Sequence, residues 1–553
     1  MPLPHACRVL IRRGLTGAEY AVPALIGLLA VLGVANSFTG HVTPDSSVYL
    51  LHARTFVQTL DRFTLSHDSK GLMLCLVLAP TVMAFGATMV AAAIPQFMAH
   101  GVACLCLFSI ARSYASARGA ATLALLCLCT VHAHLIWGGN VRPEDFALGY
   151  TAIAFWAAWR GTPRGLFWGG VACACCLFTK TTLVLAPATV LVAGCLIPPL
   201  SVGADGNARG FPPAREVGWR ALWAGLGFGL VTAAVLAWVT LFDNLTGMVR
   251  QCIQWPAEYR RLHVPGLTEI EATMRLINRT GLTILLVAAF LGLVRGWLRG
   301  PRRLSLLLAL ALLGELLRIT VEGARWPYTL TVAVLPMLLG SGLLLADKSR
   351  WRRSFLPAAI PALLALIHVL ALTAQAEGQA FFHRVWMHRP SPYEHLAAQM
   401  RASGYREGET VLVPYNDYQI ILLLNAPRPY PLLPLDFKRV PEQEQVAAQR
   451  HYRQFSPQWV VTRMKKYKGR KWKIKGGVDH AYHVVMAPGD ASVPPGDATD
   501  RNGATLSALL PDSAVYRKVL DAGYLQAWRL VECPTPQQGA GQGRLSVRAS
   551  DKL

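Results

Sequence analysis

Residues 71–91 read GLMLCLVLAPTVMAFGATMVA, a stretch of 21 residues without a charged side chain. A helix needs about 20 apolar residues to cross the roughly 30 Å hydrocarbon core of a bilayer, so the length suits a membrane span. Pro80 and Gly86 interrupt the stretch, however, and a span here would place every later basic loop on the other side of the membrane. We therefore predict a re-entrant or surface-lying segment, which requires protein or water around it and so indicates a cavity.

Similar apolar runs lie on both sides of this stretch and end at about residue 374. The chain of 553 residues is 53% apolar and 15% charged, and its mean hydropathy of +0.35 is too high for an ordinary soluble domain. No small-residue cleavage site follows the first run, so it is expected to remain as a span. We predict eleven spans, at residues 21–38, 95–111, 119–138, 146–160, 165–181, 183–200, 221–242, 280–294, 304–321, 326–346 and 354–374.

The basic residues follow the pattern of a membrane protein, although the net charge of +23 raises the question of nucleic-acid binding. With the N-terminus inside, the predicted cytoplasmic segments carry 18 basic and four acidic residues, whereas the rest of the chain before residue 375 carries 12 basic and 11 acidic residues. This asymmetry is what the positive-inside rule expects. The sequence therefore predicts a cytoplasmic N-terminus, contact with membrane lipids, and no nucleic-acid partner.

The composition changes at about residue 375, after which 24 basic and 16 acidic residues occur together with many turn formers. Strand-like patterns occupy residues 410–414, 419–424, 458–462 and 525–531, and residues 392–403 show a helical pattern. We predict an α-helical polytopic membrane domain at 1–374, with its first outer loop at 39–94. A soluble outer-face α/β domain would follow at 375–535, and a disordered tail at 536–553.

The first group of charged residues follows the first predicted span. Burying charge near a bilayer is costly, so such residues are candidates for function. Asp45 opens a short surface helix with Tyr49 on the same face, and Asp68 and Lys70 end the group. Asp45 fits either a functional carboxylate at a helix N-terminus or a simple N-cap.

The second group lies in the short outer loop between two predicted spans. It contains Arg142 and the adjacent carboxylates of Glu144 and Asp145. Two carboxylates beside an arginine can orient a hydroxyl, bind a cation, or mark the point where a helix starts. The local pattern leaves these three alternatives open.

The third group is cationic and lies at the outer ends of later spans. Lys180 stands between two apolar runs, and Arg318, Arg325 and Tyr328 lie around the end of another. Lysine and arginine in these places suit a lipid-linked phosphate. The alternative is that their side chains extend to the membrane interface without binding anything.

The twelve cysteines give little sign of metal binding. Nine lie in or beside apolar runs, where cysteine behaves as a small hydrophobic residue. Cys252 and Cys533 face the predicted outer side, where they are either paired in a disulfide or unpaired.

Together these features resemble the GT-C type glycosyltransferases. The most similar subgroup contains the protein O-mannosyltransferases and the bacterial aminoarabinose transferase of lipid A. The Trp-Trp-Asp-Tyr-Gly motif of oligosaccharyltransferases is absent. The resemblance implies an enzyme of the bacterial inner membrane that takes a sugar from a polyprenyl-phosphate donor. The acceptor would be a hydroxyl of a lipid, glycan or protein on the outer face.

The resemblance also assigns roles to the acidic residues. Asp45 matches the catalytic acid of the first loop and would be the general base on the acceptor hydroxyl. Asp145 matches a second catalytic acidic motif, to which Arg142 and Glu144 are additions that would bind substrate. Tyr49, on the Asp45 face of the first helix, is a further substrate-binding candidate.

The remaining candidates would bind the donor. Lys180 corresponds to the lysine of a Leu-Thr-Lys motif and would hold the donor phosphate. Arg325 matches an arginine near the outer end of a late span, with Arg318 and Tyr328 beside it. Asp68 and Lys70 match a segment that reads Lys-Pro-Pro in relatives, but here Lys70 is followed by Gly-Leu, so this match is degraded.

The implied reaction inverts the sugar and requires no cofactor. A carboxylate takes the proton of the acceptor hydroxyl, and cationic side chains stabilise the departing phosphate. A divalent metal is not demanded, although Asp45, Asp68, Glu144 and Asp145 can hold one. The alternatives are a transporter or flippase of a lipid-linked sugar, which would show repeat symmetry, and an enzyme similar to the O-antigen ligases and polymerases.

Overall fold

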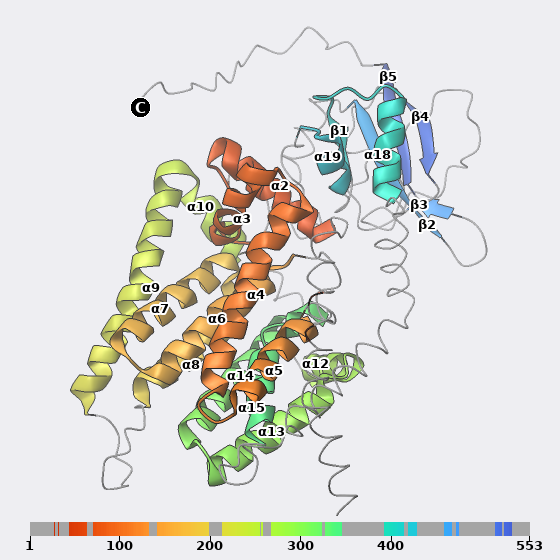
Figure 1. Ribbon diagram of the computed structural model, residues 1–553. Coiled ribbons are helices and arrows are strands. Elements are labelled where there is room, and N and C mark those ends of the chain that lie inside the picture. Colours follow the sequence, from red (N-terminus) through yellow and green to blue (C-terminus); the bar gives the residue numbers. More distant parts are fainter. Residues whose placement is uncertain are drawn as a thin grey trace, which may run out of the picture.

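The protein consists of a helical bundle and a smaller unit containing a β-sheet (Figure 1). The computed structural model describes residues 27, 31, 44–63, 70–131, 141–197, 213–254, 256–257, 267–322, 327–344, 392–413, 418–427, 458–466, 472–474, 515–522 and 525–532. The predicted domain boundary near residue 375 and the predicted tail lie outside these residues.

The bundle is formed by helices that alternate in direction along the chain. Each predicted span from 95–111 to 326–346 contains a helix. The α-helices are α2 (Pro44–Thr59), α3 (Leu72–Phe85), α4 (Met89–Ala111), α5 (Ala117–Cys129), α6 (Pro143–Arg160), α7 (Pro163–Thr179), α8 (Leu185–Leu196), α9 (Ala214–Phe242), α10 (Leu245–Val249), α12 (Leu267–Arg279), α13 (Leu282–Arg299), α14 (Arg302–Glu322) and α15 (Val334–Leu343). Shorter helical turns are η2 (Thr181–Val184), η3 (Arg250–Gln254) and η4 (Pro327–Leu330).

One end of the bundle is organised by Arg303, and we call it the Arg303 end. The guanidinium donates to the carbonyl oxygens of Ala158 and Trp159 at 2.7 Å each, and to that of Ile197 at 3.2 Å. Cations near a helix C-terminus are favoured because they satisfy its unpaired carbonyls. The contacts bring the start of α14 to the ends of α6 and α8.

The other end contains the start of α6 and the ends of α7, α9 and α14, and we call it the Asp45 end. The short helices α2 and α3 lie there as well (Figure 1). The N–H of Gly71 donates to the carbonyl oxygen of Thr179 at 3.0 Å, which joins the start of α3 to the end of α7. The N–H of Phe63 donates to Asp243 at 3.0 Å, which joins the segment after α2 to the end of α9.

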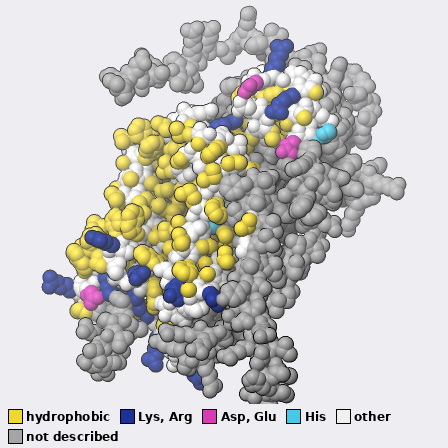
Figure 2. Space-filling model, viewed as in Figure 1, with side chains coloured by type: hydrophobic (Ala, Val, Ile, Leu, Met, Phe, Trp, Pro, Cys, Tyr) yellow, Lys and Arg dark blue, Asp and Glu magenta, His cyan; other side chains and the backbone are white. Residues whose placement is uncertain are grey.

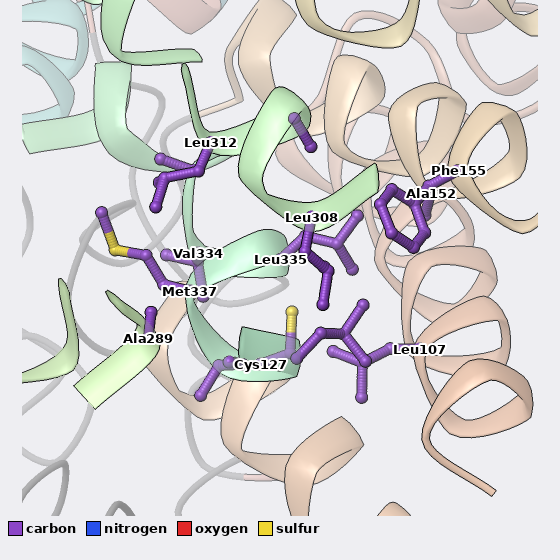
Figure 3. Close-up of a cluster of buried hydrophobic side chains, with 14 of the residues drawn as sticks. Leu107, Cys127, Ala152, Phe155, Ala289, Leu308, Leu312, Val334, Leu335 and Met337 are labelled. Atoms are coloured by element: carbon purple, nitrogen blue, oxygen red, sulfur yellow. The ribbon is translucent and has the colours of Figure 1, made fainter. Parts of the chain in front are cut away.

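The core of the bundle is a continuous set of buried apolar side chains. Figure 3 shows Leu107 of α4, Phe155 of α6, Leu308 of α14 and Leu335 of α15 converging on one region. All four are at most 1% exposed. Small residues at these contacts, including Ala152, let the helices approach closely.

The outer surface of the bundle is apolar. Large hydrophobic side chains remain exposed on it, including Leu226, Leu230 and Leu241 of α9 and Phe290 of α13. Figure 2 shows hydrophobic side chains over one face of the bundle, with lysines and arginines gathered at its lower end. Among the described residues, four helices, α4, α9, α13 and α14, are long and apolar enough to cross a membrane. The chain is a multi-pass membrane protein.

The smaller unit contains α18 (Pro392–Ala402), α19 (Gln419–Leu424) and five strands. The strands are β1 (Val411–Leu412), β2 (Trp459–Lys466), β3 (Trp472–Ile474), β4 (Val515–Ala522) and β5 (Leu525–Glu532). The sheet order is β1-β2-β5-β4, and β3 pairs with β2. β1 and β2 are parallel with Val411 opposite Trp459, whereas β2, β5 and β4 are antiparallel neighbours.

This unit packs on α2. The Arg54 guanidinium donates to the side-chain oxygen of Asn425 at 3.3 Å and to the carbonyl oxygen of Ala426 at 3.0 Å. Leu50 of α2 and Leu396 of α18 belong to one buried cluster, and both are 0% exposed. The C-terminal unit therefore holds α2, the helix whose first turn contains Asp45.

Three expectations about local structure were wrong. Pro80 does not interrupt α3, because buried side chains pack on both sides of the proline and hold the helix together. The helix ends at Gly86, as expected, but α4 begins at Met89 and so takes in residues predicted as outer loop. Residues 419–424 form α19 instead of a strand, since a short apolar run does not distinguish a buried strand from a buried helix.

Candidate functional site

The start of α6 is built around Asp145. Its Oδ2 accepts the N–H of Arg142 at 2.8 Å and the side-chain amide of Gln96 at 2.9 Å, and Oδ1 lies 3.5 Å from Nε2 of His100. Asp145 is 0% exposed. Of the three alternatives for this loop, the one that fits Asp145 is the helix start, because its carboxylate satisfies an unpaired N–H of the first turn. Its direct catalytic role stays a prediction.

Asp45 meets Arg142 at the surface of this loop. The two side chains form an ion pair between Oδ2 and Nη1, and they are 20% and 11% exposed. The neighbouring Ser46 accepts the N–H of Val141 through its hydroxyl at 2.9 Å, which fixes α2 against the start of α6. The Arg142 guanidinium also lies over the ring of Tyr328, 4.1 Å from its centroid. Arg142 thus contacts two other predicted site residues, Asp45 and Tyr328.

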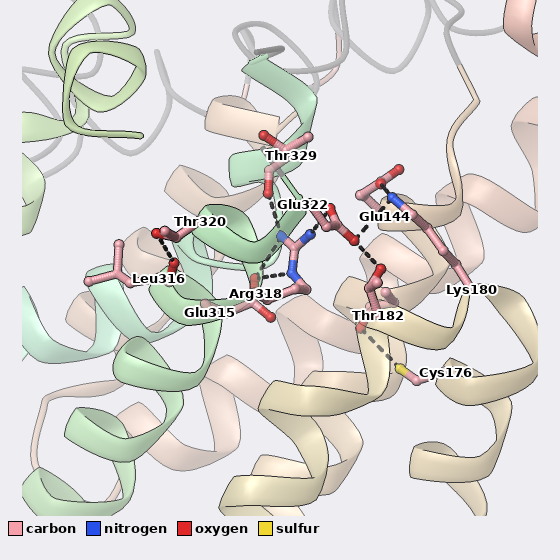
Figure 4. Close-up of polar contacts among 11 residues, drawn as sticks. Glu144, Cys176, Lys180, Thr182, Glu315, Leu316, Arg318, Thr320, Glu322 and Thr329 are labelled. Atoms are coloured by element: carbon pink, nitrogen blue, oxygen red, sulfur yellow. Dashed lines mark hydrogen bonds and ion pairs between the residues drawn. The ribbon is translucent and has the colours of Figure 1, made fainter. Parts of the chain in front are cut away.

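Lys180 contacts the same loop through Glu144 (Figure 4). It directly follows Thr179, the last residue of α7, and its backbone is extended before η2. Its ammonium lies 2.9 Å from Glu144 and 3.2 Å from Glu322, and it is 22% exposed. Thr182 donates its hydroxyl to Glu322. The predicted pair Lys180 and Glu144 is therefore brought together, and Glu322 is added to it.

Arg318 is enclosed behind Glu322. Its guanidinium is 0% exposed and donates to Glu315 at 2.9 and 3.0 Å, to Glu322 at 2.7 Å, and to the carbonyl of Thr329 at 2.5 Å (Figure 4). A side chain held in this way is not open to a lipid phosphate. The contacts instead give Arg318 the position of a support for Glu322, and hence for Lys180.

These contacts form one ion cluster at the Asp45 end. It contains three cations and five carboxylates: Arg142, Lys180 and Arg318, with Asp45, Glu144, Asp145, Glu315 and Glu322. Charges taken out of water are retained only when they are paired and hydrogen-bonded. Each cation of the cluster faces at least one carboxylate, so an anionic ligand has to compete for it.

The backbone at Lys70 is joined to the segment that carries Lys180. Its carbonyl accepts the Arg62 guanidinium at 2.8 Å, and the next residue, Gly71, is bonded to Thr179. A Cβ on Gly71 would lie 1.9 Å from the carbonyl oxygen of Phe178, so only glycine fits this close approach. Glycine at position 71 thus has a packing reason.

Three other predicted residues remain to be placed. Tyr49 is 6% exposed and lies in the buried set shared by α2 and the C-terminal unit. Asp68 and Arg325 lie outside the described residues, as does Cys533, the predicted partner of Cys252. Among the described residues, no three His, Cys, Asp or Glu side chains are grouped so as to hold a metal ion.

The sequence reasoning missed several supporting residues. Glu315 precedes Arg318 by three positions, and Glu322, which stands in the third group of charged residues without an assigned role, follows it by four. Both are spacings of contacts along one helix face. An acidic residue inside an apolar run was the available signal. Gln96 and His100 have the same four-residue spacing in α4, but nothing local shows that they face Asp145.

No protein-family profile matches the chain, and no curated protein matches its sequence. Solved structures do match. One is the crystal structure of ArnT from Cupriavidus metallidurans bound to undecaprenyl phosphate, at 14% identity with a TM-score of 0.54, covering 79% of this chain and 92% of that chain. Another is the apo oligosaccharyltransferase of Archaeoglobus fulgidus, at 12% identity with a TM-score of 0.45, covering 80% and 69%. The likeness to ArnT shows the fold, which is the GT-C fold.

Proposed function

We propose that this protein is an integral membrane glycosyltransferase that moves a sugar from a polyprenyl-phosphate donor to a hydroxyl of an acceptor. The observation that carries the proposal is the meeting of Asp45 with Arg142, beside Lys180, at the start of α6. A partly exposed carboxylate next to cations provides a base for an acceptor and ligands for a phosphate in one place. The fold shared with ArnT, whose structure is bound to undecaprenyl phosphate, supports this donor class.

The reaction follows from the chemistry of these groups. Asp45 takes the proton of the acceptor hydroxyl while the hydroxyl oxygen attacks the anomeric carbon. The bond from that carbon to the phosphate oxygen breaks, and the electron pair leaves with polyprenyl phosphate. The attack from the opposite face inverts the anomeric configuration. Arg142 and Lys180 stabilise the charge that develops on the phosphate, so no acid is needed there.

The other residues have supporting roles in this proposal. Asp145 holds the loop that carries Arg142, and Arg318 holds Glu322 beside Lys180. Tyr328 packs against Arg142 and Lys70 precedes Gly71, which is bonded to Thr179; both residues are assigned to substrate binding. Asp68, Arg325 and Tyr49 keep their predicted substrate-binding roles, as does Glu144, whose carboxylate orients Lys180.

We place the site on the outer side of a bacterial inner membrane. The arginines at the turns between α4 and α5, α6 and α7, and α13 and α14 lie at the Arg303 end, which the positive-inside rule assigns to the cytoplasm. The Asp45 end then faces outward, together with the C-terminal α/β unit. Eleven spans with an inside N-terminus are consistent with this orientation.

The test is a transfer assay with purified full-length protein. A panel of polyprenyl-phosphate sugars is incubated with the protein and with a crude outer-envelope extract as acceptor, and released polyprenyl phosphate is measured. We expect release with at least one donor, and none with Asp45→Asn at unchanged membrane insertion. Wild-type turnover in Asp45→Asn would overturn the role of Asp45. Failure of every donor would overturn the transferase and favour transport.

A further inference from the structure

The ion pair between Arg142 and Asp45 raises a question about the proposed base. A carboxylate beside a guanidinium is a weaker base than a free one, because the positive charge stabilises its ionised form. Asp45 is proposed to accept a proton, yet Arg142 holds its Oδ2. A step that moves the Arg142 charge away from Asp45 would therefore raise the basicity of that carboxylate.

Arg142 has a buried donor to offer to an incoming ligand. Its Nε–H is buried and has no acceptor among the described residues. Arg318, by contrast, donates from Nε, Nη1 and Nη2, and Lys180 lies between two carboxylates. A buried N–H without a partner is costly, so this position suits an incoming oxygen.

A phosphate is the ligand that fits this edge of Arg142. Guanidinium groups bind phosphate through two parallel N–H donors, and such bonds are stronger than those between neutral groups. Nη1 faces Asp45, so Nε lies on the part of the group that remains for the phosphate. The Tyr328 ring below the guanidinium restrains its plane and leaves it able to shift within that plane.

We propose that Arg142 is a switch that couples donor binding to the activity of the base. The donor phosphate replaces Asp45 as the ion-pair partner of Arg142. Asp45 therefore becomes a stronger base, able to accept the proton of the acceptor hydroxyl, only when a donor is bound. The acceptor oxygen then attacks the anomeric carbon, and the electron pair of the broken bond leaves on the phosphate that Arg142 holds. This inference rests on the proposed function and adds an order to it, with the donor binding before the acceptor is activated.

The consequence is that Asp45 and the phosphate compete for Arg142. The probe is undecaprenyl phosphate, whose Kd is measured by calorimetry with full-length wild-type protein in detergent. We expect Asp45→Asn to bind it about tenfold more tightly, because the competitor has been removed. Arg142→Gln should bind about tenfold more weakly. The double variant should match Arg142→Gln within about twofold.

Two further variants serve as a control and as a replacement for Arg142→Gln. Arg160→Gln makes the same change at the other end of α6, where the side chain is exposed, and it should bind as wild type does. Arg142→Lys keeps the charge but lacks Nε, so it should show only part of the gain from Asp45→Asn. Thermal unfolding shows whether each variant is folded. If Arg142→Gln does not fold, Arg142→Lys is used in its place.

The outcomes separate this inference from the proposed function. Unchanged or weaker binding by Asp45→Asn overturns the switch, as does absence of binding by the wild type. A gain from Asp45→Asn that persists in the Arg142→Gln background also overturns it, since it would show simple charge repulsion. If the coupling is found but no sugar donor releases polyprenyl phosphate, the result supports the Arg142 switch and contradicts the proposed transferase function. If transfer occurs without the coupling, only the switch falls.

Discussion

Gly71 donates its backbone N–H to the carbonyl oxygen of Thr179 at 3.0 Å, directly beside the two candidate lysines of the site. Lys70 precedes the donor in the chain and Lys180 follows the acceptor. The backbones approach so closely that a Cβ on Gly71 would lie 1.9 Å from the carbonyl oxygen of Phe178. One bond thus joins the end of the first outer segment to the end of α7.

Gly71→Ala should destabilise the protein. The added methyl group forces the backbone of α7 and the start of α3 apart, and overpacking of this kind costs about 1–3 kcal/mol. Denaturant unfolding in detergent measures the effect. Gly101→Ala is the matched control, because its Cβ would meet nothing within 4 Å and alanine favours a helix. Equal effects from the two substitutions would contradict the close approach at Gly71.

Lys180→Met should also destabilise the protein, since it leaves Glu144 and Glu322 facing each other without the ammonium between them. Removing one partner of a buried ion pair costs roughly 3–5 kcal/mol, and we expect about 2–3 kcal/mol because Lys180 is partly exposed. Adding Glu144→Gln to Lys180→Met should recover about 1 kcal/mol by removing one unpaired charge.

The control for Lys180 is an exposed ion pair. Arg275 and Glu271 interact on the surface of α12, where their side chains are 76% and 59% exposed. Arg275→Met should change the free energy of unfolding by less than about 0.5 kcal/mol. If Lys180→Met had as small an effect, the ion cluster would not be a buried structural unit.

The fold could be predicted from the sequence as far as it depends on apolar runs. Residues 221–242 and 304–321 are long and apolar enough to have a single interpretation, and α9 and α14 lie there. Residues 419–424 are too few for periodicity to separate helix from strand, so packing on α2 and α18 decides. The interruption predicted at Pro80 was also wrong because of packing, since the contacts that hold α3 together come from other segments.

The site could be predicted only in part. Charge near the span ends marked Asp45, Arg142 and Lys180 as candidates, because such charge is costly without a use. What the sequence could not show is which of these groups are open and which are enclosed. Arg318 and Asp145 looked equivalent to their neighbours, yet both are buried. Arg318 is enclosed by Glu315 and Glu322 of its own helix and by the carbonyl of Thr329, and Asp145 is held by Gln96 from α4.

Arg54→Ala should loosen the C-terminal unit from α2. It removes the two hydrogen bonds to Asn425 and Ala426, and bonds from a charged donor are worth about 1.5–3 kcal/mol. Hydrogen exchange should therefore be faster in α2, and transfer should be slower if this contact positions Asp45. Gln58→Ala, at an exposed position of the same helix, should leave the exchange rates unchanged. Equal exchange in both variants would show that Arg54 does not hold the unit.

Asp243 provides a pH-dependent contact at the end of α9. Its carboxylate accepts the N–H groups of Arg62 at 2.8 Å and Phe63 at 3.0 Å, which holds the segment after α2. Burial raises the pKa of Asp243 above its ordinary value of 3.8, the nearby Asp61 raises it further, and the two N–H donors oppose this. The folded protein therefore binds a proton at Asp243 more readily than the unfolded chain does.

The sign of the pH effect follows from this difference. A raised pKa in the folded state means that the stabilising contribution of Asp243 is complete below pH 3.8 and is lost as the pH rises through the folded value. The free energy of unfolding of the wild type, relative to that of Asp243→Asn, should therefore fall as the pH rises from about 4 to 7. Asp61→Asn should make this fall smaller, because it removes a neighbouring negative charge. A relative stability that increases with pH would instead show that the N–H donors outweigh burial and Asp61, and that Asp243 holds the segment as a carboxylate of lowered pKa.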